Sequence, residues 1–410
     1  MEERLQAINV RLYPSIEQSE YISRLIGSCR FVFNSCLEYK IAKYNTEKKS
    51  VSFGELGKHL VELKSNEETK WLADVHSKVL QQTLINLEAA YKSFFKNGVG
   101  FPKFKSKRNS KQSCRFPSDA IGGIHGNRIN IIKPLRDVLF RCSRRDERRL
   151  NQLQDKIKSA TLTKTKSGKY YFSILAELPI DANVVTPTNN SIGLDIGIKD
   201  FIVDSNGNKY ENIKIQRTNE KKLARLHRLV SRKVKDSSNR TKAIVMLARF
   251  HEKLDNIKDY YLHQIANKIA KENQLVVVED LNVSGMMQNH NLARSIQELS
   301  ISKFMSILRY KLEWNNRDFV RIDRYYPSSK RCNDCGNINH NLTLNDRTWT
   351  CPSCGKIHDR DLNAAKNIHD EGKRIQFIGL SSSESTLGEI ETSHQSSNQE
   401  KNVIRWNKTQ

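Results

Sequence analysis

Four cysteines near the C-terminal end constrain the fold of this chain more than any other feature. In the pattern C-x2-C-x15-C-x2-C, they are Cys332, Cys335, Cys351 and Cys354. This spacing is typical of a structural site in which four thiolates bind one Zn²⁺ ion. Gly336 and Gly355 follow the two pairs and tolerate the tight turn that each pair requires. Four protein ligands leave no open coordination position, so we expect the zinc ion to be structural.

Two disulfides or a redox-active pair are the alternative interpretations of these cysteines. Disulfides are typical of secreted chains, but the N-terminus lacks the basic start and apolar stretch of a signal peptide. No apolar run approaches the roughly 18 residues that cross a bilayer. A redox pair would not need a second copy. We therefore expect a cytoplasmic protein with no membrane partner. The scattered cysteines, which are Cys29, Cys36, Cys114 and Cys142, are expected to be buried small hydrophobes.

The charge of the chain indicates a polyanionic partner. The chain has 69 Lys and Arg against 45 Asp and Glu, a net charge of +24, and residues 375–410 contribute none of the excess. Such an excess repels itself in a compact fold unless a polyanion offsets it. A generically basic surface is the alternative, but the cations are concentrated at 103–115, 141–149 and 221–235. We expect the protein to bind nucleic acid.

The first half of the chain predicts a β-barrel that is interrupted by helices. Apolar residues alternate over 5–13, which indicates a strand. Ser15 then begins a helix with Gln18 as its capping-box partner, and helical patterns continue to about residue 95. Short β-type runs follow, two of them joined across a turn at 166–168. We predict a small barrel whose first strand is separated from the others by a helical block.

The second half predicts an α/β domain. A polar link at 184–190 precedes two closely joined strands, and the Asn206-Gly207 pair predicts a hairpin to a third. The elements that we expect next are a basic helical hairpin (219–272), a buried strand (275–282), a helix (295–315), a strand (318–326) and a helix that begins near residue 361. We predict that the polar tail from 373 to 410 is disordered.

Three acidic residues are the candidate catalytic groups. Asp195 lies within the otherwise apolar GLDIG strand, Glu279 ends the strand LVVVE, and Asp361 begins the last helix. A buried charge costs several kcal/mol unless a metal or a partner compensates it. Gly193 and Gly197 flank Asp195 and leave room for a ligand beside the backbone. The alternative interpretations are that Asp195 is a solvated strand end, that Glu279 is a surface acid, and that Asp361 is only a helix cap.

Taken together, these acids suit the ribonuclease H-like fold, in which carboxylates from separate elements meet at a pair of divalent ions. Hard oxygen ligands suit Mg²⁺, and two such ions promote phosphodiester hydrolysis. We expect Asp361 both to cap its helix and to bind metal. We expect Asp359 to contact a metal ligand without binding the metal itself. Asp204 and Asp280 are less favoured as ligands, since strand alternation turns Asp280 away from its neighbour.

Several motifs occur in the order found in one known family. They are GLDIGIKDF, VVVEDLNVSGM, YYPSSKRCNDCG, WTCPSCG and HDRDLNAAKNI, preceded by RLYPSIEQSEYISRLIGSCRFVFN and FPKFKSKRNSKQS. Over about residues 5–372 the chain resembles the TnpB (OrfB) proteins of small insertion sequences, which are related to the type V CRISPR effector nucleases. The resemblance implies an RNA-guided endonuclease with a RuvC-like nuclease domain and the catalytic residues Asp195, Glu279 and Asp361.

The resemblance also implies a domain arrangement and a set of partners. The expected domains are a wedge barrel (1–14 and 98–183), a helical recognition domain (15–97), the RuvC-like domain (190–327 and 357–372) and a zinc ribbon (328–356). The partners would be a transposon-derived guide RNA and double-stranded DNA, bound by a monomer next to a short transposon-adjacent motif. The residues expected to contact nucleic acid are Lys78, Gln81, Gln82, Lys103 and Lys105.

Other functions remain open at this point. A solvated polar helix face accounts equally well for Lys78, Gln81 and Gln82. The main alternative is a guided DNA-binding regulator of transposition or transcription that does not cut. A DNA-joining transposase and an unguided structure-specific resolvase are further alternatives. The three acids in their expected contexts favour a nuclease over these.

Overall fold

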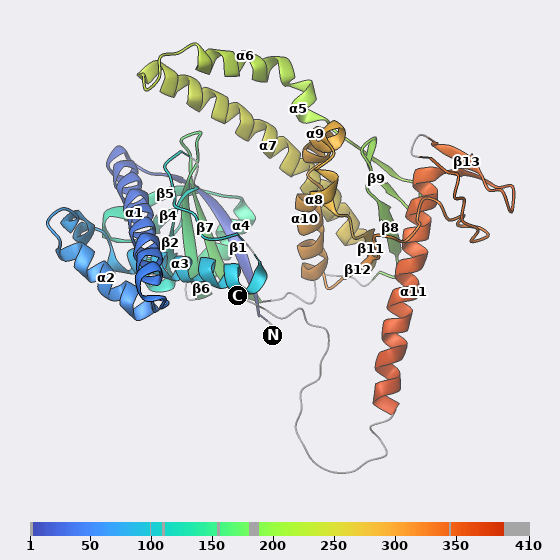
Figure 1. Ribbon diagram of the computed structural model, residues 1–410, viewed down its shortest axis with the longest axis horizontal. Coiled ribbons are helices and arrows are strands. Elements are labelled where there is room, and N and C mark those ends of the chain that lie inside the picture. Colours follow the sequence, from blue (N-terminus) through green and yellow to red (C-terminus); the bar gives the residue numbers. More distant parts are fainter. Residues whose placement is uncertain are drawn as a thin grey trace. The chain divides into compact units, whose positions relative to one another are not determined.

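The computed structural model describes residues 3–98, 100–108, 111–153, 156–179, 188–343 and 346–388 (Figure 1). The chain forms two compact units. Unit 1 comprises Met1–Ala182 and Lys221–Lys253, and unit 2 comprises Asn183–Glu220 and Leu254–Gln410. The long helix α7 (Ser238–Glu272) therefore contributes to both.

Unit 1 contains a seven-stranded antiparallel sheet in the order β2-β6-β7-β1-β5-β4-β3. Its strands are β1 (Glu3–Tyr13), β2 (Gln112–Pro117), β3 (Gly123–His125), β4 (Arg128–Asn130), β5 (Val138–Arg141), β6 (Ile157–Lys164) and β7 (Tyr170–Pro179). The predicted first strand and the predicted β6–β7 hairpin are confirmed. Among the described residues, the edge strands β2 and β3 do not pair with each other. A closed barrel requires such a pairing, so the barrel stays a prediction.

Helices follow the first strand of unit 1 as far as Asn97, as the apolar spacing predicts, and further short helices occur later in the unit. The helices of unit 1 are α1 (Ile16–Glu47), α2 (Phe53–Ser65), η1 (Lys70–Asp74), α3 (Ser77–Asn97), η2 (Ser118–Ala120), η3 (Lys133–Leu135), α4 (Arg144–Gln152) and α6 (Glu220–Ser231). The capping box is present: Ser15 Oγ accepts the Gln18 N–H at 3.2 Å, and Gln18 Oε1 accepts the Ser15 N–H at 3.0 Å. Buried side chains of α1 and of β1 share one hydrophobic core.

Unit 2 is built on a five-stranded sheet in the order β10-β9-β8-β11-β12. The strands are β8 (Ser191–Asp195), β9 (Asp200–Asp204), β10 (Lys209–Glu211), β11 (Leu275–Glu279) and β12 (Asp318–Ile322). The strands β8, β11 and β12 are parallel, whereas β9 and β10 are antiparallel and form the predicted hairpin. The parallel strands therefore present their carboxyl ends at one edge of the sheet.

Helices cover both faces of this sheet, which explains the unbroken apolar run of β11. Val276 and Val278 pack with α7, α9 (His290–Leu299) and α10 (Ile301–Trp314), whereas Val277 faces α11 (Arg360–Gly388). The single helix predicted over 295–315 is wrong, because Ser300 adopts a left-handed conformation (φ 54°) that separates α9 from α10. The remaining elements of unit 2 are α5 (Ile215–Thr218), α8 (Val283–Met286), β13 (Thr348–Thr350) and β14 (Ile357–Asp359).

The last helix is longer than the sequence predicts. It continues to Gly388, where a disordered tail was expected from 373 onward. No proline occurs between 360 and 388, so no residue removes a helical N–H from this stretch. The rest of the predicted tail, 389–410, lies outside the described residues.

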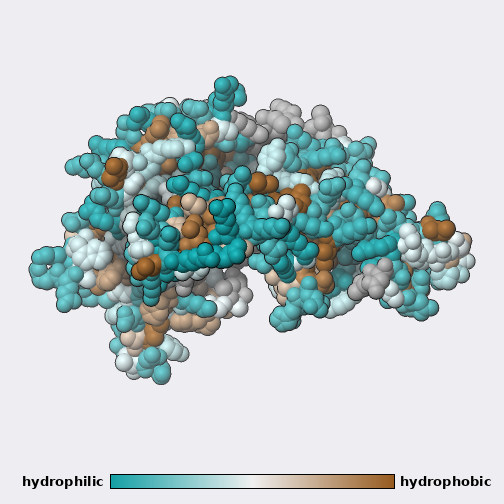
Figure 2. Space-filling model, turned by 90° about the horizontal axis from the view of Figure 1, so that it is seen from above, coloured by the Kyte–Doolittle hydropathy of each residue, from teal (hydrophilic) through white to brown (hydrophobic). Residues whose placement is uncertain are grey.

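The surface agrees with the polar composition. Hydrophilic residues dominate the face shown in Figure 2, and hydrophobic residues appear there as separate spots. Of the helices in the described part of the chain, none combines the length and the apolar character needed to cross a membrane.

Candidate active site and metal-binding centre

The three predicted catalytic acids converge at the carboxyl edge of the unit 2 sheet. Asp195 is the last residue of β8, and Glu279 is the last residue of the adjacent parallel strand β11. The register pairs Leu194 with Val278, which sets the two strand ends side by side. Asp361 is the second residue of α11, and this helix packs on both strands. Residues far apart in the sequence are thus brought to one edge.

Electrostatics supports the proximity of the three carboxylates. Burial raises the pKa of Asp195 to about 8, and the negative charges of Glu279 and Asp361 act in the same direction. Burial also raises the pKa of Glu279, although the Ser328 hydroxyl opposes this by donating a hydrogen bond to Glu279 Oε1. Among the described residues, the three acids are not a group whose ligand oxygens all lie within 4.8 Å of one another. Their charges are close enough to repel one another, but their oxygens are not all close enough to bind a single ion together.

Asp359, and not Asp361, caps the last helix. Asp359 Oδ1 accepts the backbone N–H groups of Asp361 at 3.0 Å and of Leu362 at 3.1 Å. Its other carboxylate oxygen accepts a hydrogen bond from Lys209 Nζ at 3.0 Å. The prediction that Asp361 caps the helix is therefore wrong, because the residue just before the helix fills that role. The Asp361 carboxylate is left facing Arg347, whose Nη1 lies 3.5 Å away.

Two glycines allow α11 to approach the sheet closely. A Cβ on Gly193 would lie 2.3 Å from the carbonyl oxygen of Ala365, and a Cβ on Gly372 would lie 2.3 Å from the side chain of Val277. The space beside Gly193 is thus filled by the helix, which contradicts the prediction that a ligand approaches there. Gly197 lies in the turn after β8, where a Cβ would meet the Asp200 carbonyl oxygen at 3.0 Å.

A hydrogen-bond network that the sequence analysis missed ties the acids to the cysteine segment. Ser328 donates to Glu279, and its own carbonyl oxygen accepts from Asn367 Nδ2 at 2.7 Å. Asn367 Nδ2 and Asn363 Nδ2 also donate to the Arg331 carbonyl oxygen, at 2.6 and 2.7 Å. Both asparagines are only 2% exposed. Their spacing of four residues on one helix face was the signal available in the sequence.

The four cysteine sulfurs converge as the spacing predicts. All four Sγ atoms lie within 4.8 Å of one another, with Cys332 and Cys354 at 3.7 Å and Cys335 and Cys351 at 3.5 Å. A disulfide requires about 2.05 Å, so the two-disulfide alternative does not hold in this structure. Zn–S bonds of about 2.3 Å in a tetrahedron place sulfurs roughly 3.8 Å apart, so this donor set fits zinc.

The surroundings of the sulfurs are also suited to a metal. Gly336 and Gly355 adopt φ values of 78° and 71°, as predicted for the turns that follow the two pairs. His358 is buried, and its Nε2 lies 3.1 Å from the sulfur of Cys332. His358, Cys332 and Asp334 form a second group of ligand atoms that lie within 4.8 Å of one another. The sequence analysis did not single out His358.

Comparison with known proteins identifies the family. A protein of Streptomyces pristinaespiralis, whose name describes it as a candidate RNA-guided DNA endonuclease, is 35% identical over 92% of this chain and 92% of its own length. The chain belongs to the TnpB (OrfB) family. InsQ of Escherichia coli K12, which carries the same description, is 33% identical over 92% of this chain and 94% of its own length.

Three family models match different parts of this TnpB-family chain. The OrfB_IS605 model, described as a probable transposase, matches residues 173–290, and a Cas12f1-like TNB domain matches 302–368. A model described as a helix-turn-helix domain matches 1–49, where the structure has β1 and the single helix α1. A solved Cas12f1–sgRNA–target DNA complex aligns with 90% of this chain and 99% of that chain, at 14% identity and a TM-score of 0.49.

The predicted nucleic-acid contacts on α3 differ in their accessibility. Lys78 is exposed and forms an ion pair with Asp119, and Gln81 is exposed. Gln82 is buried at 9% exposure. The structure therefore does not place Gln82 on the surface that the prediction requires, because helix packing covers it.

The two predicted contact lysines between α3 and β2 also differ in their accessibility. Lys103 is exposed. Lys105 is half-buried, with its Nζ 3.8 Å from the centre of the Phe33 ring, and burial lowers the pKa of its amine. Its backbone N–H donates to Asn34 Oδ1 at 2.8 Å, and its carbonyl oxygen accepts from Asn34 Nδ2 at 2.9 Å. Lys105 thus anchors its segment to α1.

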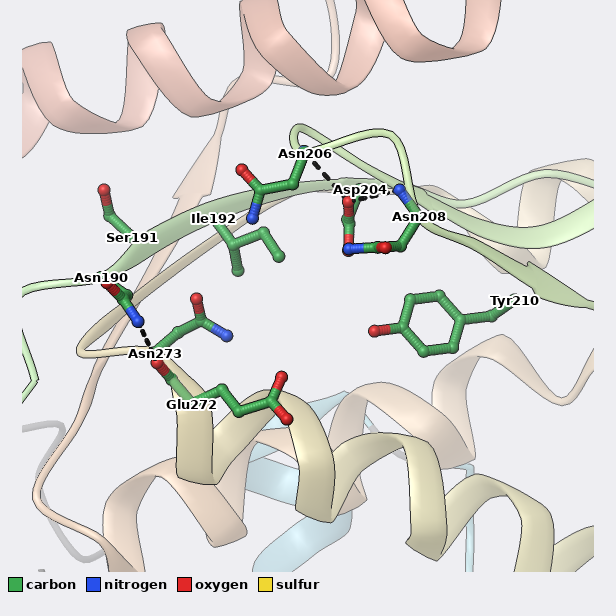
Figure 3. Close-up of a pocket in the computed structure, with 9 residues that line it drawn as sticks. All are labelled: Asn190, Ser191, Ile192, Asp204, Asn206, Asn208, Tyr210, Glu272 and Asn273. Carbon is green, nitrogen blue, oxygen red and sulfur yellow. Dashed lines mark hydrogen bonds between the residues drawn. The ribbon is translucent and has the colours of Figure 1, made fainter.

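A polar pocket of about 260 Å³ lies at the end of β8 opposite Asp195. Figure 3 shows Asn206, Asp204 and Asn208 from the β9–β10 hairpin facing Glu272 and Asn273 at the end of α7. Asp204 is buried, and both of its oxygens are occupied by hydrogen bonds from the backbone N–H groups of Asn206 and Asn208 and from the Asn208 amide. Asp204 therefore stabilises the hairpin turn.

Proposed function

We propose that this protein is an RNA-guided endonuclease that cuts double-stranded DNA next to a short transposon-adjacent motif. The observation that carries the proposal is the convergence of Asp195, Glu279 and Asp361 at the carboxyl edge of the parallel strands. In open α/β sheets, ligands bind at this edge. The two relatives that match over most of their lengths are both named for RNA-guided DNA cleavage.

The carboxylates define what the site does chemically. Their hard oxygens suit Mg²⁺, and two ions held there would stabilise the attacking water and the leaving oxygen of a phosphodiester. Asp195 must lose its proton to become a ligand, since its pKa is about 8 without metal. The Ser328 hydroxyl holds the Glu279 carboxylate in one orientation, and the Asp359 cap fixes the start of the helix that carries Asp361. We assign all three acids as the catalytic metal ligands.

The finer architecture follows from the same proposal. Unit 2 would be the RuvC-like, ribonuclease H-like nuclease domain, with the segment 328–356 as a zinc ribbon whose single Zn²⁺ is structural. In unit 1, the antiparallel sheet would be the wedge barrel and α1–α3 the recognition block. The net charge of +24 supports binding to the phosphate backbones of RNA and DNA. These contacts need not depend on sequence, because base pairing with the guide RNA would recognise the target. Exposed Lys78, Gln81 and Lys103 remain candidate contacts.

The test is guided cleavage by the full chain, purified from cells that also express its native transposon end. The wild type is expected to cut a duplex that carries the guide-matched sequence. Asp195→Ala should lower the rate by roughly a thousandfold or more while target binding persists, because the metal site supplies several kcal/mol of transition-state stabilisation. The matched control is Asp280→Asn. Asp280 follows Glu279 directly, yet it forms ion pairs with Arg321 and Arg324.

Two outcomes would overturn the proposal. Full cleavage by Asp195→Ala would show that the acid site is not required for the reaction. A wild type that binds the guided target but does not cut it in Mg²⁺ would instead be a regulator of transposition or transcription.

A further inference from the structure

The segment that joins α3 to β2 has an unusual charge. Residues 89–118 contain eight Lys and Arg and no Asp or Glu. Lys92, Lys96 and Lys103 are exposed, and they form no ion pair with the described residues. A stretch of chain with this charge attracts an anion, and it repels a second copy of itself.

Aromatic rings are exposed among these cations. Phe95, Phe101 and Phe104 are 76%, 44% and 56% exposed. Large apolar side chains gathered on a surface indicate a binding site, whereas single ones need no explanation. The exposed rings of Phe95, Phe101 and Phe104 with Lys92, Lys96 and Lys103 are called the aromatic–basic surface below.

Phe95 and Phe101 are held in place by other rings before any partner binds. Phe94 contacts both Phe95 and Phe101 edge-on, with ring centres 5.0 and 5.4 Å apart. Tyr91 contacts Phe101 in the same way at 5.5 Å. The following segment is anchored to α1 by the two hydrogen bonds between Lys105 and Asn34. Such preorganisation lowers the entropic cost of binding.

Exposed rings among unpaired lysines match the chemistry of a single nucleic-acid strand. Its bases stack on aromatic faces whatever their sequence, and its phosphates attract lysines. A double helix offers phosphates but keeps its bases stacked on one another, so it would leave the rings uncovered. An acidic protein would pair with the lysines but offers few planar faces for the rings.

We propose that the aromatic–basic surface binds an unpaired segment of the guide RNA, with bases stacked on Phe95 and Phe104 and phosphates beside Lys96 and Lys103. This inference rests on the proposed function for its choice of strand. A target strand is present only during cleavage, whereas the guide stays bound throughout. A resident RNA therefore covers apolar rings that would otherwise remain exposed to solvent.

The experiment measures binding of a fluorescein-labelled 20-nucleotide oligouridylate and of an abasic RNA of the same length to the purified full chain. The double variant F95A/F104A should weaken oligouridylate binding by roughly thirtyfold or more, which corresponds to the loss of two stacked bases. It should leave abasic binding and the salt dependence unchanged, because phenylalanine is uncharged. Lys96→Ala should instead reduce the salt dependence for both probes.

A rescue variant separates stacking from misfolding. Phe95→Trp should keep oligouridylate binding within about threefold of the wild type, because indole stacks at least as well as phenyl. Unfolding temperatures should be similar across the set, since the truncated rings are largely exposed. Equal oligouridylate affinity for wild type and F95A/F104A would overturn the proposal, and so would a wild type that does not distinguish oligouridylate from abasic RNA.

The source of the strand is tested by the RNA that co-purifies after expression with the native transposon end. F95A/F104A should retain less RNA per protein than the wild type. Unchanged retention with weaker binding of single-stranded DNA would assign the surface to a target strand, against the proposal. A wild-type dimer that the variant converts to a monomer would assign it to a second copy, also against the proposal. None of these readouts uses cleavage, so their failure is distinct from failure of the nuclease assignment.

Discussion

The two candidate metal sites of unit 2 lie close together in the fold but are assembled in opposite ways. The cysteine site takes its ligands from one short segment, and its sulfurs lie within 4.8 Å of one another. The acid site takes one ligand from each of β8, β11 and α11, and its charges repel. The first site is encoded locally. The second exists only when a helix is packed in one position on a sheet.

This contrast predicts that the two sites respond differently to loss of metal, which is the largest effect that we expect. A zinc-selective chelator, or Cys351→Ser, should unfold the segment 328–356, because structural zinc contributes on the order of 10 kcal/mol to small zinc domains. Removing Mg²⁺ should abolish cleavage but leave the fold intact. Zinc content, circular dichroism and cleavage, measured on the same samples, check this. An intact segment without zinc would contradict it.

The packing of α11 gives the second prediction. Gly193→Ala places a Cβ against the Ala365 carbonyl oxygen, and a backbone atom cannot move aside cheaply. We expect a loss of about 3 kcal/mol in unfolding free energy and a fall in cleavage, with zinc content unchanged. The matched control is Gly57→Ala, since a Cβ at Gly57 meets nothing within 4 Å. Denaturant unfolding measures both, and equal stability of Gly193→Ala and wild type would refute the close approach.

The raised pKa of Asp195 gives a third, smaller prediction. Its folded pKa of about 8 exceeds the ordinary value of 3.8, so the folded state keeps a proton that the unfolded state has released. The stability from this group is fully present below pH 4, is lost as pH rises, and has gone above about pH 8, with a slope of at most about 1.4 kcal/mol per pH unit.

Asp195→Asn should remove this decline between pH 6 and 8 in magnesium-free buffer, and Asp280→Asn should not. Melting temperatures across that range measure it. Mg²⁺ binding to the wild type should tighten as pH rises, because the metal displaces the Asp195 proton. A decline that persists in Asp195→Asn would show that another group causes it.

The smallest effect separates two aspartates that are two residues apart. Asp359→Ala should cost about 1 kcal/mol of stability, because two N–H groups at the start of α11 lose their acceptor. Asp361→Asn should abolish cleavage without a loss of stability, since it removes a repelling charge from the site. Thermal unfolding and cleavage of both variants test the division of roles. A loss of stability in Asp361→Asn and a loss of cleavage in Asp359→Ala would instead show that Asp361 caps the helix.

The sequence predicted what local patterns can encode. The cysteine spacing, the Ser15 capping box, the buried strand that ends in Glu279 and the Asn206-Gly207 hairpin are all confirmed. These features depend on neighbours a few residues away. Asp195 and Glu279 were singled out because a charge in an otherwise apolar strand must be compensated, and Asp361 because it begins the last helix. The structure brings the three together.

What the sequence could not predict depends on contacts between distant segments. Gly193 was interpreted as room for a ligand, but the occupant is a helix more than 160 residues further along the chain. Gln82 is buried by packing that its helical pattern does not reveal, and Ser300 breaks a helix whose apolar spacing looks continuous. The acidic pair around Arg360 suggested the wrong cap, because either aspartate can accept the hydrogen bonds at a helix start.

The long helix α11, which begins at the acid site, also connects that site rigidly to a distant packing contact. Gly372 lies eleven residues beyond Asp361, about 16 Å along the helix axis at 1.5 Å per residue. A rigid helix carries an axial displacement undiminished along its length, so a slide of 1 Å at Gly372 becomes a slide of 1 Å at Asp361. An error of that size in a catalytic group costs about a hundredfold in rate. On the proposed function, the position of Asp361 would therefore depend on the fit between Gly372 and Val277, about three helical turns and 16 Å away along the helix.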